Sequence, residues 1–246
     1  MGDAMMDFLD KGPIETSRQL DDYCYHVAGR IGSNFLNELI RQKDCVDGKP
    51  VELDDELAAQ FGRYLQFINI IKGIRKDYNE GRKFLPGELI HRGISYEFMM
   101  ESKTSLDAQD VRDYVFNRVL EFAETRFERS VRYVKSIPSE LSGYKAFCLV
   151  PLITGQKTIE NMRDSKAEKV FNGDEDATKI SYGIGSIMNF SYYLAKNDEG
   201  KKANRWLDEF GNSPRRFSFK PDDYVLWAKD FIDIESDTLK KHLGIA

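Results

Sequence analysis

The sequence has few of the residues that cross-link, anchor or export a protein. Its 246 residues include three cysteines, which are widely spaced and form no C-x-x-C pair: Cys24, Cys45 and Cys148. This spacing argues against a disulfide scaffold or a zinc site, and it predicts reduced thiols in a cytoplasmic protein. The longest apolar run, residues 146–153, contains Pro151 and is far shorter than the roughly 18 residues of a membrane span. The first residues lack the regions of a signal peptide, so any membrane contact is expected to be peripheral.

An excess of basic charge is missing as well. Lys and Arg number 36 against 41 Asp and Glu, which gives a net charge of -5, and the two signs are interleaved along the chain. Nucleic acid is therefore not expected as a partner. The chain is long enough for one sizeable core or two small ones.

Strand-like alternation and hairpin turns are missing, whereas helical periodicity runs through most of the chain. Apolar residues at three- and four-residue spacing predict helices over residues 17–42, 54–79, 107–136, 143–162 and 179–196. Ser17 is the expected N-cap of the first helix, Asp54 or Asp55 that of the second, and Pro151 is expected to kink or interrupt the fourth. The sequence thus predicts an all-α fold, with a helical domain over residues 1–199 and a helical appendage over residues 200–246.

Two ordered motifs carry the most specific signal. Residues 21–32 read Asp-Asp-Tyr-Cys-Tyr-His-Val-Ala-Gly-Arg-Ile-Gly, and residues 62–86 combine Leu-Gln-x-x-Asn-Ile-Ile with Gly-Arg-Lys-Phe-Leu-Pro. Together they resemble the D-x-Y-C-x-x-V-A-G-x-x-G and L-Q-x-x-N-I-[IL]-R-D-x-x-E-D…G-R-x-[FY]-x-P signatures of squalene and phytoene synthases. The similarity covers about residues 1–182, at decreasing quality along the chain. Members of this family join two prenyl diphosphates head to head.

The resemblance implies a fold, ligands and a catalytic residue. It implies an isoprenoid-synthase-like helical bundle around a central cavity, which binds farnesyl or geranylgeranyl diphosphate. It also implies Mg2+ as a cofactor, with NADPH in addition for a squalene-forming member. Tyr23 is the tyrosine expected beside the departing diphosphate, although its spacing from Val27 and Ile31 fits a core-packing residue as well. Gly29 and Gly32 are expected to let two helices approach closely beside the cavity.

The second motif departs from the family pattern where the family has carboxylates. The family's first aspartate is Gly73 in this sequence and its glutamate is Lys76, which leaves Asp77 as the expected metal ligand. A single carboxylate is a poor magnesium site, so Mg2+ is expected to bind weakly or to be shared. The added basic residues favour an alternative, in which a diphosphate is held by direct ion pairing.

Four further residues are expected to bind the substrate. Gln66 and Asn69 lie three or four residues from their motif neighbours, so they share one helix face with Gly73 and Asp77. Lys72 adds a cation to this helix. Arg82 resembles a family position near the diphosphate, and an ordinary loop arginine explains it equally well.

The family's first Asp-rich motif is not found upstream of Tyr23. The segments 3–7 and 233–237 both fit D-x-x-x-D, but we expect them on solvated helix faces. Three hypotheses remain open: a prenyltransferase, a non-catalytic relative that acts in binding or assembly, and the C-terminal part of a synthase whose N-terminal half is a separate chain or was lost. A second copy, a partner chain or the aromatic-rich segment 200–246 is expected to cover the apolar helix faces that the missing half would bury.

Overall fold

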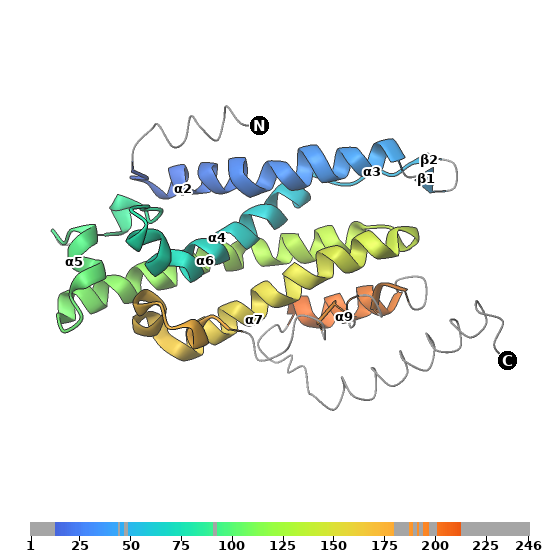
Figure 1. The fold of residues 1–246 in the computed structure, drawn as a ribbon. Coiled ribbons are helices and arrows are strands. Elements are labelled where there is room, and N and C mark those ends of the chain that lie inside the picture. Colours follow the sequence, from blue (N-terminus) through green and yellow to red (C-terminus); the bar gives the residue numbers. More distant parts are fainter. Residues whose placement is uncertain are drawn as a thin grey trace. The chain divides into compact units, whose positions relative to one another are not determined.

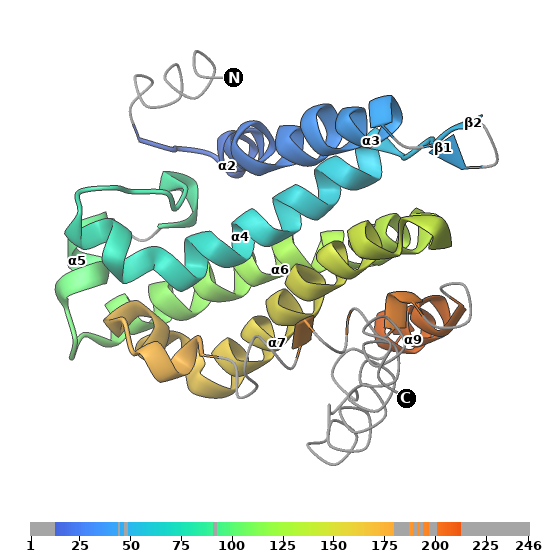
Figure 2. The ribbon, with the colours of Figure 1, turned by 45° about the vertical axis from the view of Figure 1, so that its right-hand side comes forward.

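Helices make up most of the region that the computed structural model describes (Figures 1 and 2). The described residues are 13–43, 45–46, 49–90, 93–179, 187–188, 191, 194–196 and 201–212. Within them, the only strands are β1 (Cys45–Val46) and β2 (Lys49–Pro50), a short antiparallel pair between two helices. The all-α prediction is confirmed. The predicted D-x-x-x-D segments 3–7 and 233–237 lie outside the described residues.

The chain divides into two compact units. The first unit comprises Met1–Ser136 and Thr154–Ile180, and the second comprises Ile137–Ile153 and Ser181–Ala246. Helix α7 (Ser142–Asn172) therefore gives its first residues to the second unit and the rest to the first. The boundary predicted between residues 199 and 200 lies within the second unit, next to helix α9 (Lys201–Asn212).

The first predicted helix, 17–42, is a helical rod of four consecutive pieces. They are α2 (Ser17–Cys24), the wide π-turns η1 (Tyr25–Gly29) and η2 (Ile31–Leu36), and α3 (Asn37–Lys43). The N-cap is Thr16 rather than the expected Ser17, because a capping box forms there. The Thr16 hydroxyl accepts the Gln19 backbone N–H at 3.2 Å, and the Gln19 side chain accepts the Thr16 N–H at 3.0 Å.

Small residues bring this rod against helix α4 (Asp55–Asn79). A Cβ placed at Gly62 of α4 would lie 2.4 Å from the Ala28 carbonyl oxygen, and one at Gly32 would lie 2.9 Å from the Ala58 carbonyl oxygen. Only a residue without a side chain lets the two backbones come this close. The predicted close approach of the two helices is confirmed.

Helix α4 packs along the long helix α6 (Leu106–Ser136), and the two run side by side in both views (Figures 1 and 2). The N-cap of α4 is Asp54, whose carboxylate accepts the Leu57 N–H at 2.9 Å. Aromatic rings fill the contact: Tyr64 lies 5.7 Å from Phe127, and Phe67 lies 5.7 Å from Phe122, measured between ring centroids. These contacts form the core of the first unit.

Two details of the later helices differ from the sequence-based expectation. Helical structure continues past residue 162 to Asn172, as two helical segments of α7 joined across a kink at Lys166, and Pro151 lies within helical backbone. The single non-helical residue in α7 is Lys166, with φ 69° and ψ 158°. The helix predicted over 179–196 falls mostly outside the described residues, and residues 187–188, 191 and 194–196 are helical. No described helix is both long enough and apolar enough to cross a membrane.

Candidate functional site

The start of α2 is held by the loop that follows α4. Backbone bonds join the Gly87 N–H to the Ile14 carbonyl at 3.0 Å and the Glu88 N–H to the Glu15 carbonyl at 2.9 Å. The Glu88 carboxylate also accepts the Ser17 N–H, the first of the helix, at 2.6 Å. An anion at a helix N-terminus is favourable, and it fixes α2 relative to the 3-10 turn η3 (Gly87–Leu89). The two sequence motifs are thus brought together.

Tyr23 meets the second motif directly. Its ring stacks on that of Phe84, with centroids 5.0 Å apart and planes 28° apart. Partial burial raises the pKa of the Tyr23 hydroxyl, and the nearby Cys24 and Asp77 add to the rise. The phenol therefore stays protonated at neutral pH and offers a hydrogen-bond donor. Both the core-packing and the functional interpretation of Tyr23 fit this position.

Asp77 and Arg82 form an ion pair beside Tyr23. The Asp77 carboxylate oxygen Oδ1 accepts Arg82 Nη2–H at 2.5 Å and Nε–H at 3.1 Å. Arg82 Nη2 also lies 2.5 Å from a carboxylate oxygen of Glu80. These carboxylates raise the pKa of Arg82 further. Because 44% of the Arg82 side chain is exposed, it remains accessible to an incoming anion.

A pocket of about 260 Å³ gathers five of the six predicted site residues. The α4 helix contributes Gln66, Asn69 and Asp77, while α2 contributes Tyr23 and the following loop contributes Arg82. Ile70 and Phe84 complete its lining. The structure therefore places these side chains at one site, and their chemical roles stay predictions.

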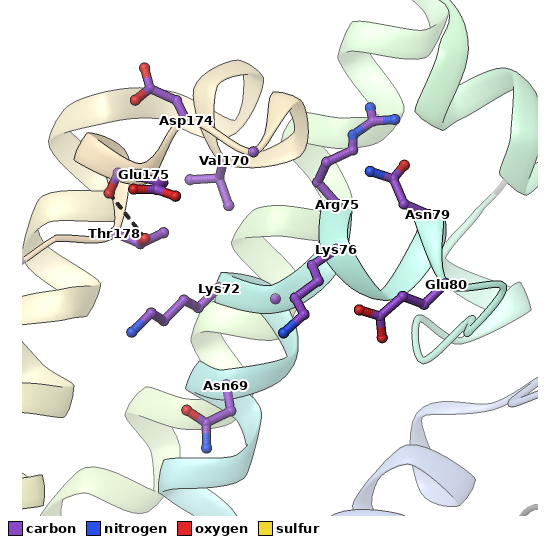
Figure 3. A pocket seen from close by; sticks show the side chains of 12 residues that line it. Asn69, Lys72, Arg75, Lys76, Asn79, Glu80, Val170, Asp174, Glu175 and Thr178 are labelled. Atoms are coloured by element: carbon purple, nitrogen blue, oxygen red, sulfur yellow. Dashed lines mark hydrogen bonds between the residues drawn. The ribbon is translucent and has the colours of Figure 1, made fainter.

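Lys72, the sixth predicted residue, lines a second pocket of about 670 Å³ (Figure 3). Asn69 lines both pockets, so the two adjoin on α4. The opposite wall is built from residues 170–178, which include the 3-10 turn η5 (Glu175–Ala177). In the sequence, residues 172–176 read Asn-Gly-Asp-Glu-Asp, which indicates an acidic turn. Nothing in the local sequence shows that this turn faces Lys72, because about a hundred residues separate them.

Asp21, the first residue of the Tyr-Cys motif, has a structural role that the sequence did not reveal. Its carboxylate oxygen Oδ1 accepts an Arg126 Nη2–H bond at 2.6 Å and lies 3.8 Å from Arg63 Nε. These two contacts join α2 to α6 through Arg126 and to α4 through Arg63. Burial lowers the pKa of Arg126, and Asp21 opposes that shift. Asp21 thereby helps to hold Tyr23, two residues further along, in place.

The donor set beside Tyr23 does not fit Mg2+, which prefers several carboxylate and water oxygens. Within the described part of the chain, no group of three or more His, Cys, Asp or Glu side chains could hold a metal ion. The one carboxylate in the smaller pocket, Asp77, is paired with Arg82. A Cβ at Gly73 would lie 3.0 Å from Asp77 Oδ2, so a position where the family has a carboxylate directly faces Asp77.

Comparison with known proteins gives consistent sequence matches. The squalene/phytoene synthase family matches residues 1–181. Squalene synthase from Bos taurus is 27% identical over 175 residues, which is 70% of this chain and 39% of that protein. The bifunctional lycopene cyclase/phytoene synthase of Arthroderma gypseum is 28% identical over 176 residues, which is 70% of this chain and 28% of that protein. The chain thus spans well under half the length of these curated relatives.

Solved structures show the same fold. The complex of TcSQS with the ligand E5700 matches with a TM-score of 0.58 at 20% identity, and covers 92% of this chain and 63% of its own. The complex of TcSQS with BPH1237 matches with a TM-score of 0.57 at 18% identity, with the same coverage. At this identity the likeness describes the helical architecture alone.

Proposed function

The chain belongs to the squalene/phytoene synthase family, and on this premise we propose that it binds a prenyl diphosphate in isoprenoid biosynthesis. The ligand is farnesyl or geranylgeranyl diphosphate, and the pathway leads to squalene or to a carotenoid precursor. Condensation of two such molecules head to head requires completion by a half that carries the other Asp-rich motif.

One observation carries this proposal: residues from both sequence motifs line a single pocket. Gln66 and Asn69 present amide donors, and the protonated Tyr23 hydroxyl presents another. Arg82 presents a planar guanidinium, which suits phosphate oxygens because its N–H groups form a fixed fork. A diphosphate would compete with Asp77 for Arg82, so ligand binding would exchange one ion pair for another.

Tyr23 is proposed as the catalytic residue, beside the diphosphate as it departs. Its hydroxyl would donate a hydrogen bond to the leaving oxygen, where negative charge develops. Asp77 is proposed as this chain's contribution to a shared Mg2+ site. Because Asp77 alone does not fit the ion, further carboxylates would have to come from the completing half.

Binding of farnesyl and geranylgeranyl diphosphate to the full chain, measured by isothermal titration calorimetry in Mg2+ buffer, tests the proposal. We expect binding that weakens about tenfold in Arg82→Gln, as charge-assisted hydrogen bonds to the ligand are lost. Farnesol, which lacks the diphosphate, is the matched control ligand and should bind much more weakly. Equal affinity for farnesol and farnesyl diphosphate would contradict the proposal.

A second candidate is a non-catalytic relative that acts in binding or assembly. The observation that favours it is the replacement of two family carboxylates by Gly73 and Lys76, together with the pairing of Asp77 with Arg82. A product assay with farnesyl diphosphate, Mg2+ and NADPH separates the two. Squalene formed by the chain, alone or with an identified partner, would exclude the non-catalytic role.

A further inference from the structure

Two lysines of the larger pocket have no ion-pair partner within the part of the chain that the structure describes. Lys72 and Lys76 lie four residues apart on α4, and both line the pocket together with the amide side chains of Asn69 and Asn79. Figure 3 shows both lysine side chains extending from α4. Among the described residues, neither lysine makes an ion pair or a side-chain hydrogen bond. Like charges at this spacing repel one another, and a bridging anion would relieve that repulsion.

The third cation of this pocket, Arg75, already makes hydrogen bonds and an ion pair within the protein. Its Nε–H donates to the Phe171 carbonyl at 2.6 Å, and its Nη2–H donates to the Met100 carbonyl at 2.5 Å. Nη1 lies 3.6 Å from a Glu101 carboxylate oxygen. Arg75 therefore fastens the end of α7 and leaves the lysines as the cations available to a ligand.

Two of the three carboxylates that line the pocket also have partners within the protein. Glu80 is paired with Arg82 at 2.5 Å, and the Asp174 carboxylate accepts the Asp176 N–H at 3.0 Å as the cap of η5. Figure 3 shows the Asp174 carboxylate pointing away from Lys72 and Lys76. Glu175 is the remaining acidic side chain. The pocket therefore has two lysine charges that are not neutralised by a partner and one such carboxylate, Glu175. This net positive charge favours the binding of an anion.

We propose that Lys72 and Lys76 bind a diphosphate group directly, with no bridging metal ion. This inference rests on the proposed function and deepens it, since the family places carboxylates on this helix face where this chain has Gly73 and Lys76. Ammonium groups bind phosphate oxygens by charge-assisted hydrogen bonds, and the two asparagine amides add neutral donors. The pocket adjoins the Tyr23 pocket through Asn69, so a diphosphate here lies next to the proposed catalytic residue.

Inorganic pyrophosphate is the probe, titrated into the full chain by calorimetry in EDTA and again in excess Mg2+. We expect binding in EDTA that weakens about tenfold in Lys72→Gln and in Lys76→Gln, because each loses a charge-assisted contact. Lys103→Gln removes the same charge from an exposed site outside the pocket and should leave the affinity unchanged. Binding that appears only with Mg2+, or that survives loss of both lysines, would overturn the inference.

Glu175→Gln distinguishes direct binding from metal bridging by the sign of its effect. Without a metal, removal of the one available carboxylate lowers repulsion, and affinity in EDTA should rise about threefold. If a metal ion bridged the diphosphate to Glu175, the same change would weaken binding in Mg2+ and overturn the inference. Circular dichroism of each variant verifies that the helices are intact.

Farnesyl diphosphate titrated alongside keeps the two proposals separable. Prenyl binding that requires Mg2+ would leave the proposed function standing and overturn the metal-free site. Pyrophosphate binding in EDTA without any prenyl binding would support the metal-free site and overturn the proposed function.

Discussion

At the scale of single residues, Gly62 allows the helical segment 17–43 and α4 to pack closely. A Cβ at this position would lie 2.4 Å from the Ala28 carbonyl oxygen and 2.9 Å from the Gly29 Cα. Both are backbone atoms, which cannot move aside as a flexible side chain would. We expect Gly62→Ala to lower the free energy of unfolding by about 1–3 kcal/mol, as overpacking does, although alanine is the better helix former.

Thermal unfolding followed by circular dichroism measures this effect, with Gly143→Ala as the matched control. Gly143 is also helical, and a Cβ there would have no heavy atom within 4 Å. The control should therefore raise stability slightly, by up to about 1 kcal/mol, through helix propensity alone. A Gly62→Ala protein as stable as the control would show that the helices separate without cost.

A second residue-scale prediction concerns Gly73 and Lys76. The Cβ of residue 73 would point at Asp77 Oδ2, 3.0 Å away, so Gly73→Asp places a second carboxylate beside Asp77. With Lys76→Glu in addition, the helix face gains the oxygen ligands that Mg2+ prefers. We expect the double variant to bind Mg2+ more tightly than the natural chain, measured by calorimetry.

The control for this design is Gly143→Asp with Lys103→Glu, which makes the same change of charge away from Asp77. It should leave Mg2+ affinity at the level of the natural chain. Tight stoichiometric binding of Mg2+ by the natural chain itself would contradict the weak site that we infer from the Asp77–Arg82 pair.

At the scale of elements, the attachment of α2 to the loop after α4 depends on one carboxylate. The hydrogen bonds from Ser17 hold the pKa of Glu88 below its ordinary value. A carboxyl group whose pKa is lower in the folded state stabilises the fold above its unfolded pKa, about 4.3, and this contribution is lost as the pH falls through the folded pKa. Stability should therefore decline below about pH 4.3.

Glu88→Gln should reduce stability at pH 7 and weaken its dependence on pH below 4.3, because the titrating group is gone. Urea unfolding at a series of pH values measures both effects. Glu128→Gln, at another exposed position on α6, is the control for the loss of one negative charge. If Glu88→Gln and Glu128→Gln give parallel curves, the Ser17–Glu88 contact does not hold α2.

At the scale of the whole molecule, α9 covers apolar surface in the second unit. Four of its side chains are buried: Ala203, Trp206, Leu207 and Phe210. Asn204 accepts a hydrogen bond at 3.0 Å from Nζ of Lys145, which is 1% exposed. A chain that ends at residue 199 would lose this cover, and we expect it to self-associate or to lose cooperative unfolding.

Size-exclusion chromatography with light scattering compares this truncation with one that ends at residue 212 and keeps α9. The longer variant should have the same oligomeric state as the full chain. If the shorter variant is a soluble monomer that folds cooperatively, residues 200–246 are not needed to cover apolar surface. The predicted contribution of the aromatic residues after 212 lies outside the described residues.

Local sequence signals were sufficient for the helices and for much of the site. Apolar spacing located α4 and α6 to within a residue or two of their ends, and the helical offsets of Gln66, Asn69 and Asp77 placed them on one face, as the pocket shows. The continuation of α7 past residue 162 was not predicted, although no proline or glycine lies between residue 162 and Gly173 to end a helix. Thr16 was missed as a cap because Ser17 carries the same signal one residue later.

The sequence by itself determined the fold class, the family and the loss of carboxylates at Gly73 and Lys76, since these follow from periodicity and residue identity. Only the tertiary structure decided that Asp77 is paired with Arg82 and that the turn 172–178 faces Lys72 and Lys76. It also decided that Asp21 joins three helices through its contacts with Arg63 and Arg126. The groups in these pairings lie far apart along the chain or in a loop. Their distances are set by tertiary packing, which the local periodicity of the sequence does not encode.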